Sequence, residues 1–113
     1  MATNVCIDVD LTLIDQHGEL QPGVKDVLES LRNEHGCHLH LWSAAGADYA
    51  RESAEAHGLT KLFNGFSAKP DILVDDLPET TLARLEVRFS GNSAWTDVHR
   101  RIEQFMSAED DFP

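Results

Sequence analysis

The chain has 113 residues, enough to bury one hydrophobic core but too few for a catalytic domain joined to a second domain of similar size. Its formal net charge of -11 excludes a general nucleic-acid or acidic-membrane surface, because such surfaces need a basic patch. No apolar run approaches the roughly 20 residues of a membrane span, and no basic stretch at the start indicates a signal peptide, so we expect one cytoplasmic domain over residues 1–113.

The first predicted element is a buried strand that begins at Val5 and delivers Asp8 and Asp10 to its carboxyl end. The strand has no hairpin-forming residues behind it, which favours the first strand of a parallel sheet. Residues two apart project to the same side of an extended backbone, so both carboxylates are expected to face one site. Adjacent carboxylates repel each other unless a cation or a shared proton relieves them. The pair therefore predicts a metal, a proton-transfer role, or both.

A turn-rich loop over residues 15–19 follows, and Pro22 predicts the start of a helix that runs to about Glu34 and stops at Gly36. Residues 37–42 alternate in polarity, as expected for a second strand. This order indicates a βαβ unit.

The second strand passes through the turn 43–46 into another predicted helix, which ends near Gly58. A short apolar piece around residues 62–63 then precedes a loop. Cys6 and Cys37 lie in the two strand-like runs and fit no metal-ligand spacing, so we expect both to be reduced residues of the core.

Residues 71–75 predict a third clear strand, again apolar and again ending in acid. A short helix from Pro78 to about Leu85, an edge strand over 86–89 and a helix over 95–106 complete the pattern, and 107–113 are expected to be a frayed tail. The predicted fold is a single α/β domain, a doubly wound parallel sheet with helices on both faces in three layers.

Polar residues that could bind a ligand or take part in catalysis lie at the ends of the predicted strands, where ligands of open α/β sheets bind. They are Asp8, Asp10, Ser43, Lys69, Asp75 and Asp76. A cluster of carboxylates favours a hard, oxygen-ligated ion such as Mg²⁺. Ser43 and the following backbone amides, beginning with Ala44, open a predicted helix and suit a phosphate oxygen, while Lys69 supplies a cation for phosphoryl charge.

At these residues the sequence resembles the phosphatase branch of the haloacid dehalogenase-like superfamily. The motif D-x-D-x-T-L is matched by residues 8–13, and a hydrophobic strand ending in Ser or Thr is matched by 39–43. Lys69-Pro70 matches the third motif, and the strand ending in paired acids is matched by 72–76. All four occur in the family's order. The resemblance implies a Rossmann-like hydrolase domain.

The resemblance implies that Asp8 attacks phosphorus to form an aspartyl-phosphate, while Asp10 acts as general acid and then general base. It implies that Asp8, the Asp10 carbonyl and Asp75 ligate Mg²⁺, with Asp76 bound through water or holding a neighbour in place. In the same way, Ser43 would hold a phosphoryl oxygen, and Lys69 would pair with Asp8 and with the phosphate. The acid at Asp10 disfavours dehalogenation, because the dehalogenase members lack an acid there.

Two features of the spacing distinguish this chain from many members of the superfamily. Only five residues separate Lys69 from Asp75, so no helix fits between the third and fourth motifs. The segments that could hold a cap domain are also short, which predicts an open site for a phosphorylated substrate of unknown size, with an oligomer partner possible.

Two other functions remain open at this point. A receiver-like phosphoacceptor module also combines an acid cluster with a Ser or Thr and a Lys-Pro, but it places the Lys-Pro after its phosphoacceptor, on the last strand. A protein that keeps the fold but serves only in binding is the other alternative. The sequence names neither the substrate nor the oligomeric state.

Overall fold

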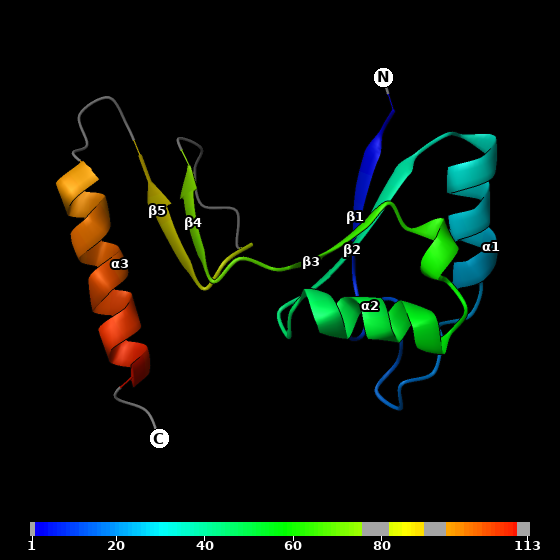
Figure 1. Ribbon diagram of the computed structural model, residues 1–113, viewed down its shortest axis with the longest axis horizontal. Helices are drawn as coiled ribbons and strands as arrows, with labels where there is room; N and C mark the ends of the chain where they lie inside the picture. The colour runs from blue at the N-terminus through cyan, green and yellow to red at the C-terminus, as the bar shows by residue number, and fades with distance from the viewer. Residues whose placement is uncertain (1, 76–81, 90–94, 111–113) are drawn as a thin grey trace. The chain divides into compact units, whose positions relative to one another are not determined.

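The computed structural model describes residues 2–75, 82–89 and 95–110. It divides into two compact units, Met1–Lys69 and Pro70–Pro113 (Figure 1). Both units combine parallel strands with helices, which confirms the predicted α/β class. The finer prediction, one doubly wound sheet in a single domain, stays a prediction.

The first unit is built on a parallel sheet with the strand order β1-β2-β3. These strands are β1 (Asn4–Asp8), β2 (His38–Ser43) and β3 (Gly65–Ala68). In the register of the sheet, Asp8 lies opposite Trp42, and Ser43 lies opposite Ala68. The carboxyl ends of the three strands therefore meet at one edge, as the sequence predicted for the first two.

The first helix begins two residues later than predicted. α1 spans Val24–Glu29. Gly23 has a left-handed φ of 79°, and this non-helical residue separates Pro22 from the helix. The chain continues as a wide π-helical turn, η1 (Ser30–Glu34), which ends at the predicted place. Gly36, with φ of 67°, then allows the reversal into β2.

The second helix has the predicted extent, and the segment after it differs from the prediction. α2 spans Ala47–Ala56 and is followed by the 3-10 helix η2 (Thr60–Leu62). The loop that we expected after residues 62–63 contains β3, whose short sequence GFSA has too few apolar residues to show a strand pattern. Pairing along β2 rather than local propensity makes this segment a strand.

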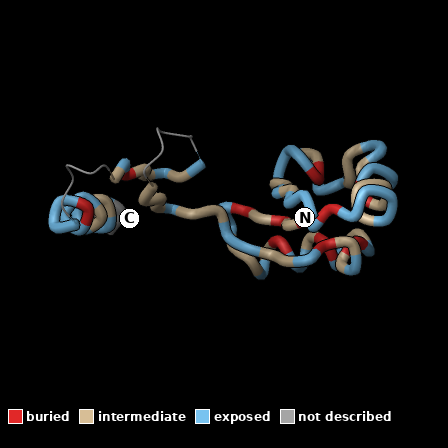
Figure 2. The backbone as a smooth tube through the Cα atoms, turned by 90° about the horizontal axis from the view of Figure 1, so that it is seen from above, coloured by how far each residue is buried: buried red, intermediate tan, exposed pale blue. Residues whose placement is uncertain are grey.

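The core of the first unit lies between the sheet and its helices. Leu39 and Leu41 of β2 have no exposed surface, and they share a buried cluster with Leu28 of α1 and Ala50 of α2. Figure 2 marks the buried parts of the backbone in red. Residues of α1 and α2 thus pack on the same face of the sheet. This is expected when two successive crossover connections, β1 to β2 and β2 to β3, are both right-handed and both step in the same direction across the sheet.

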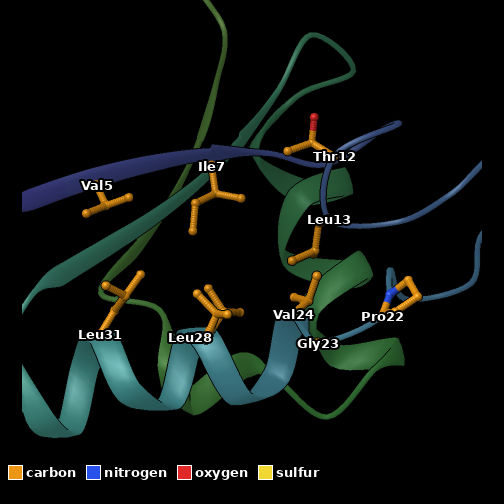
Figure 3. Close-up of a pocket in the computed structure, with 10 residues that line it drawn as sticks. Val5, Ile7, Thr12, Leu13, Pro22, Gly23, Val24, Leu28 and Leu31 are labelled. Atoms are coloured by element: carbon orange, nitrogen blue, oxygen red, sulfur yellow. The ribbon is translucent and has the colours of Figure 1, made fainter.

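An apolar cavity of about 340 Å³ lies between β1 and α1. Val5 and Ile7 point toward Leu28 of α1 and Leu31 of η1, which point back at them (Figure 3). The opposite face of β1 carries Cys6, which is exposed. The prediction that Cys6 belongs to the core is therefore wrong for this unit, because strand alternation turns it away from the helices, whereas Cys37 is buried as expected.

The side chain of Asn64 ties the amino end of β2 to η1. Its Oδ1 accepts hydrogen bonds from the Leu39 amide at 2.9 Å and from Arg32 Nη1 at 2.6 Å. Arg32 also donates to the carbonyl of Leu62 at 3.4 Å. We call these bonds the Asn64 tie.

The second unit contains a parallel pair of strands, β4 (Ile72–Asp75) and β5 (Leu85–Arg88), and the helix α3 (Trp95–Asp110). The predicted helix from Pro78 lies partly outside the described residues, and its expected end is wrong because Leu85 opens β5. The tail prediction is wrong for 107–110, which continue α3, and residues 111–113 lie outside the described part. Within the described ranges, no helix has the length and apolar character that crossing a membrane demands.

We predict that Asn64→Ala lowers the free energy of unfolding by about 1–3 kcal/mol, because it removes the acceptor of a backbone amide and of Arg32 at once. Urea denaturation followed by circular dichroism measures the change. Asn33→Ala is the matched control, since this exposed neighbour should change stability by less than about 0.5 kcal/mol. Equal effects of the two substitutions would contradict a stabilising role for the Asn64 tie.

Candidate active site

A tight turn after β1 holds the first two acids. Val9 and Leu13 are buried at 0% and 1% exposure, and Asp10 between them is exposed. The amide of Leu13 donates to the carbonyls of Asp8 at 3.2 Å and Val9 at 3.0 Å. Leu11 adopts a left-handed φ of 59°, a conformation unusual for a bulky residue. Burial on both sides thus fixes a strained loop that presents Asp10 to solvent.

Asp8 forms the central ion pair of the site. Its Oδ1 lies 3.1 Å from Nζ of Lys69, and about 30% of each side chain is exposed. Its Oδ2 accepts a long hydrogen bond of 3.5 Å from the hydroxyl of Thr12. The structure thus contains the Asp8–Lys69 pair that the resemblance implied, and both oxygens of Asp8 have a partner.

Lys69 is placed by the sheet as well as by its charge. It follows β3 directly, and its amide donates to the carbonyl of Ser43 at 2.9 Å. Its Nζ also lies 6.0 Å from the ring centroid of Trp42, at the limit of a cation–π contact. The sequence left open how far this lysine reaches, and the structure shows that it extends β3 toward Asp8.

Asp10 has a different partner, which the sequence analysis missed. The hydroxyl of Tyr49, in the first turn of α2, donates to Asp10 Oδ1 at 2.6 Å. This bond raises the pKa of the Tyr49 hydroxyl above its ordinary value of 10.0, and burial and the negative charge of Asp10 act in the same direction. A neutral phenol therefore holds Asp10, whereas a cation holds Asp8.

Ser43 ends β2 and is almost completely buried, with 1% exposure. Its Oγ accepts a hydrogen bond from the amide of Ala45 at 3.0 Å, and its carbonyl accepts one from Gly46 at 3.1 Å. The residue before α2 is Gly46, so Ser43 and Ala44 belong to a turn rather than to the helix. The prediction that Ser43 opens the helix is therefore wrong, because three turn residues separate them, but its hydroxyl proton remains a possible donor.

The second pair of acids belongs to the other unit. Asp75 is the last residue of β4, as predicted for a strand that ends in acid. Asp76 lies outside the described residues. The structure thus brings together Asp8 and Lys69 in the first unit, and it leaves the contribution of Asp75 and Asp76 to the site as a prediction from the motif order.

A small surface cavity of about 290 Å³ follows the two acids along the chain. It is lined by the exposed Leu11 and by Asp15, Gln16, His17 and Gln21. Asp15 shapes the loop, because its Oδ1 accepts hydrogen bonds from the amides of His17 at 2.8 Å and Glu19 at 3.0 Å.

The donor chemistry at the first two acids fits Mg²⁺. Asp8 and Asp10 offer carboxylate and carbonyl oxygens, and Mg²⁺ in phosphoryl-transfer sites takes one or two carboxylates together with phosphate oxygens and water. Among the residues that the structure describes, no group of three or more His, Cys, Asp and Glu side chains is arranged to hold a metal ion. A metal here would therefore rely on main-chain and phosphate oxygens as well as on side chains.

Tyr49, Thr12 and Trp42 are the site contacts to which sequence reasoning gave no role. Thr12 belonged to the first motif, and Trp42 directly precedes Ser43, so both had a positional signal. Tyr49 lies 39 residues from Asp10, and no spacing rule connects them. The sequence feature that could have indicated Tyr49 is its place in the first turn of the helix that follows the second strand.

The arrangement as a whole combines a carboxylate beside an ammonium group with a second, hydrogen-bonded carboxylate two residues later. Such a set can supply a nucleophile, a proton carrier and a positive charge for a phosphoryl group. Comparison of the chain with protein-family models, curated proteins and solved structures gave no match.

We predict that Tyr49, which is the chain's one tyrosine, titrates above pH 10.0. Because its pKa is raised on folding, the stabilisation from its bond to Asp10 is complete below pH 10.0 and is lost as the pH rises through the raised pKa. Tyrosinate absorbance, recorded while circular dichroism confirms the fold, measures the midpoint. Asp10→Ala should lower that midpoint toward 10.0, and a wild-type midpoint at or below 10.0 would contradict the bond.

Proposed function

We propose that the protein is a Mg²⁺-dependent phosphomonoesterase of the haloacid dehalogenase-like kind, acting through an aspartyl-phosphate on Asp8. The observation that carries the proposal is the 3.1 Å pair between Asp8 Oδ1 and Lys69 Nζ, formed at the carboxyl edge of a parallel sheet. Two motifs far apart in the sequence supply these two residues. Their contact supports the reading of both motifs as parts of one site.

In the first proposed step, a carboxylate oxygen of Asp8 attacks the phosphorus of a phosphate monoester. The bond between phosphorus and the leaving oxygen breaks, and its electron pair goes to that oxygen. Asp10, in its protonated form, gives its proton to the same oxygen. The products are the free alcohol, the Asp10 carboxylate and an acyl phosphate on Asp8.

In the second step, Asp10 takes a proton from water while the water oxygen attacks phosphorus. The bond between phosphorus and Asp8 breaks and returns the electron pair to the Asp8 carboxylate, and inorganic phosphate leaves. Asp10 is again protonated, so the cycle closes without a further reactant.

The other residues would bind the phosphoryl group. Lys69 supplies positive charge next to the nucleophile, where negative charge accumulates on the phosphoryl oxygens. Ser43 would donate its hydroxyl proton to one of those oxygens, and the amide of Ala44 would donate to the same group.

Mg²⁺ would be held by the Asp8 carboxylate and the Asp10 carbonyl, and bound there it would neutralise charge on the phosphoryl oxygens. Asp75 and Asp76 are proposed as further ligands on the motif order alone. We also propose a single doubly wound domain without a cap, a cytoplasmic location and a phosphorylated substrate.

We predict that the protein hydrolyses p-nitrophenyl phosphate in the presence of Mg²⁺ and loses this activity in EDTA. Asp8→Asn should lower kcat by at least about 10³-fold, because the amide is a poor nucleophile. Steady-state release of p-nitrophenol and of phosphate measures both effects.

Asp48→Asn is the matched control for this experiment. It makes the same carboxyl-to-amide change at an exposed residue of α2 that pairs with Arg51 at the surface, so activity should be retained. A stable phosphoprotein formed from acetyl phosphate, without further turnover, would instead favour a receiver-like module. Absence of turnover by the wild type with Mg²⁺ would overturn the phosphomonoesterase proposal.

A further inference from the structure

Tyr49 connects the buried cluster of the first unit to an exposed acid. It lies in the first turn of α2, and its side chain packs against the buried cluster of the first unit. Asp10 lies on the strained turn after β1 and is exposed. The 2.6 Å hydrogen bond between Tyr49 Oη and Asp10 Oδ1 therefore anchors a carboxylate that its own loop leaves open to solvent.

The bond also distinguishes the two oxygens of Asp10. The phenol hydroxyl donates to Oδ1, which leaves Oδ2 to carry the proton that Asp10 would exchange with a substrate. A general acid must hold its proton within hydrogen-bonding reach of the leaving oxygen, and a small displacement of the acid has a large effect on rate. Fixing Oδ1 restricts rotation of the carboxyl group and so restricts where Oδ2 lies.

We propose that Tyr49 is a positioning residue that holds the Asp10 carboxyl group for proton delivery to the leaving oxygen. This inference rests on the proposed function, because it assigns Asp10 the role of general acid. It goes further by naming a residue outside the four motifs and by assigning it to one chemical event, the departure of the leaving group. Transfer of the phosphoryl group to Asp8 should be unaffected when the leaving group departs without a proton.

The experiment compares two substrates of similar size in the Tyr49→Phe variant. p-Nitrophenolate leaves readily without a proton, whereas phenolate is a much poorer leaving group and needs the acid. With Mg²⁺ present and enzyme in excess over substrate, the first-turnover release of p-nitrophenol and of phenol is measured from p-nitrophenyl phosphate and phenyl phosphate. The ratio of the two rates does not depend on the fraction of enzyme that is folded.

We expect Tyr49→Phe to slow the release of phenol by about 10-fold or more and to change the release of p-nitrophenol by less than about 3-fold, since general acid catalysis as a whole contributes about 10²–10⁴-fold. Ser30→Ala is the matched control. It also removes a helical hydroxyl of the first unit, but this hydroxyl donates to the exposed Glu34 rather than to Asp10 or Tyr49, so the ratio should be unchanged.

The outcomes separate this inference from the proposed function. An unchanged ratio in Tyr49→Phe, with both rates equally lowered or neither, would overturn the positioning role and leave the phosphatase proposal intact. A wild type that releases p-nitrophenol but no phenol would also overturn it, since Asp10 would then give no acid assistance for Tyr49 to support. A wild type that releases neither product would overturn the proposed function, and this inference with it.

Discussion

The parallel pairing of β1, β2 and β3 decides which side chains meet at the candidate site. The register places Asp8 beside Trp42 and Ser43 beside Ala68, and the amide of Lys69 continues the pairing by donating to the Ser43 carbonyl. Side chains alternate between the faces of a strand, so a slip of β3 by one residue would send Lys69 to the other face. The Asp8–Lys69 pair therefore depends on the register between β2 and β3.

The two acids after β1 are close in sequence but have different environments. Asp8 is paired with an ammonium group, and Asp10 accepts a hydrogen bond from a neutral phenol. Carboxylates with such different partners are suited to different chemical roles. About 30% of each side chain in the Asp8–Lys69 pair is exposed, so this ion pair contributes only about 0–1 kcal/mol to stability.

The sequence allowed the prediction of elements with strong periodicity and of residues that end them. Local sequence pattern predicted the parallel strands around Ile7 and Leu41 and the helix before Gly58. The motif resemblance predicted that Lys69 lies near Asp8. The strand β3 and the Tyr49–Asp10 bond did not, because tertiary pairing rather than local sequence creates both. The exposure of Cys6 was missed for a related reason: an apolar run does not say which of its residues face the helices.

The distance between the Asn64 tie and the candidate site affects which substitutions the protein can tolerate. The tie secures β2 at Leu39, whereas the candidate site lies at Ser43, four residues further along the strand and roughly 13 Å away at about 3.3 Å per residue. Substitutions at sites so far apart, with no shared partners, generally have additive effects. Mutations that change the side chains of the candidate site at the carboxyl edge can therefore accumulate without weakening the Asn64 tie at the amino edge.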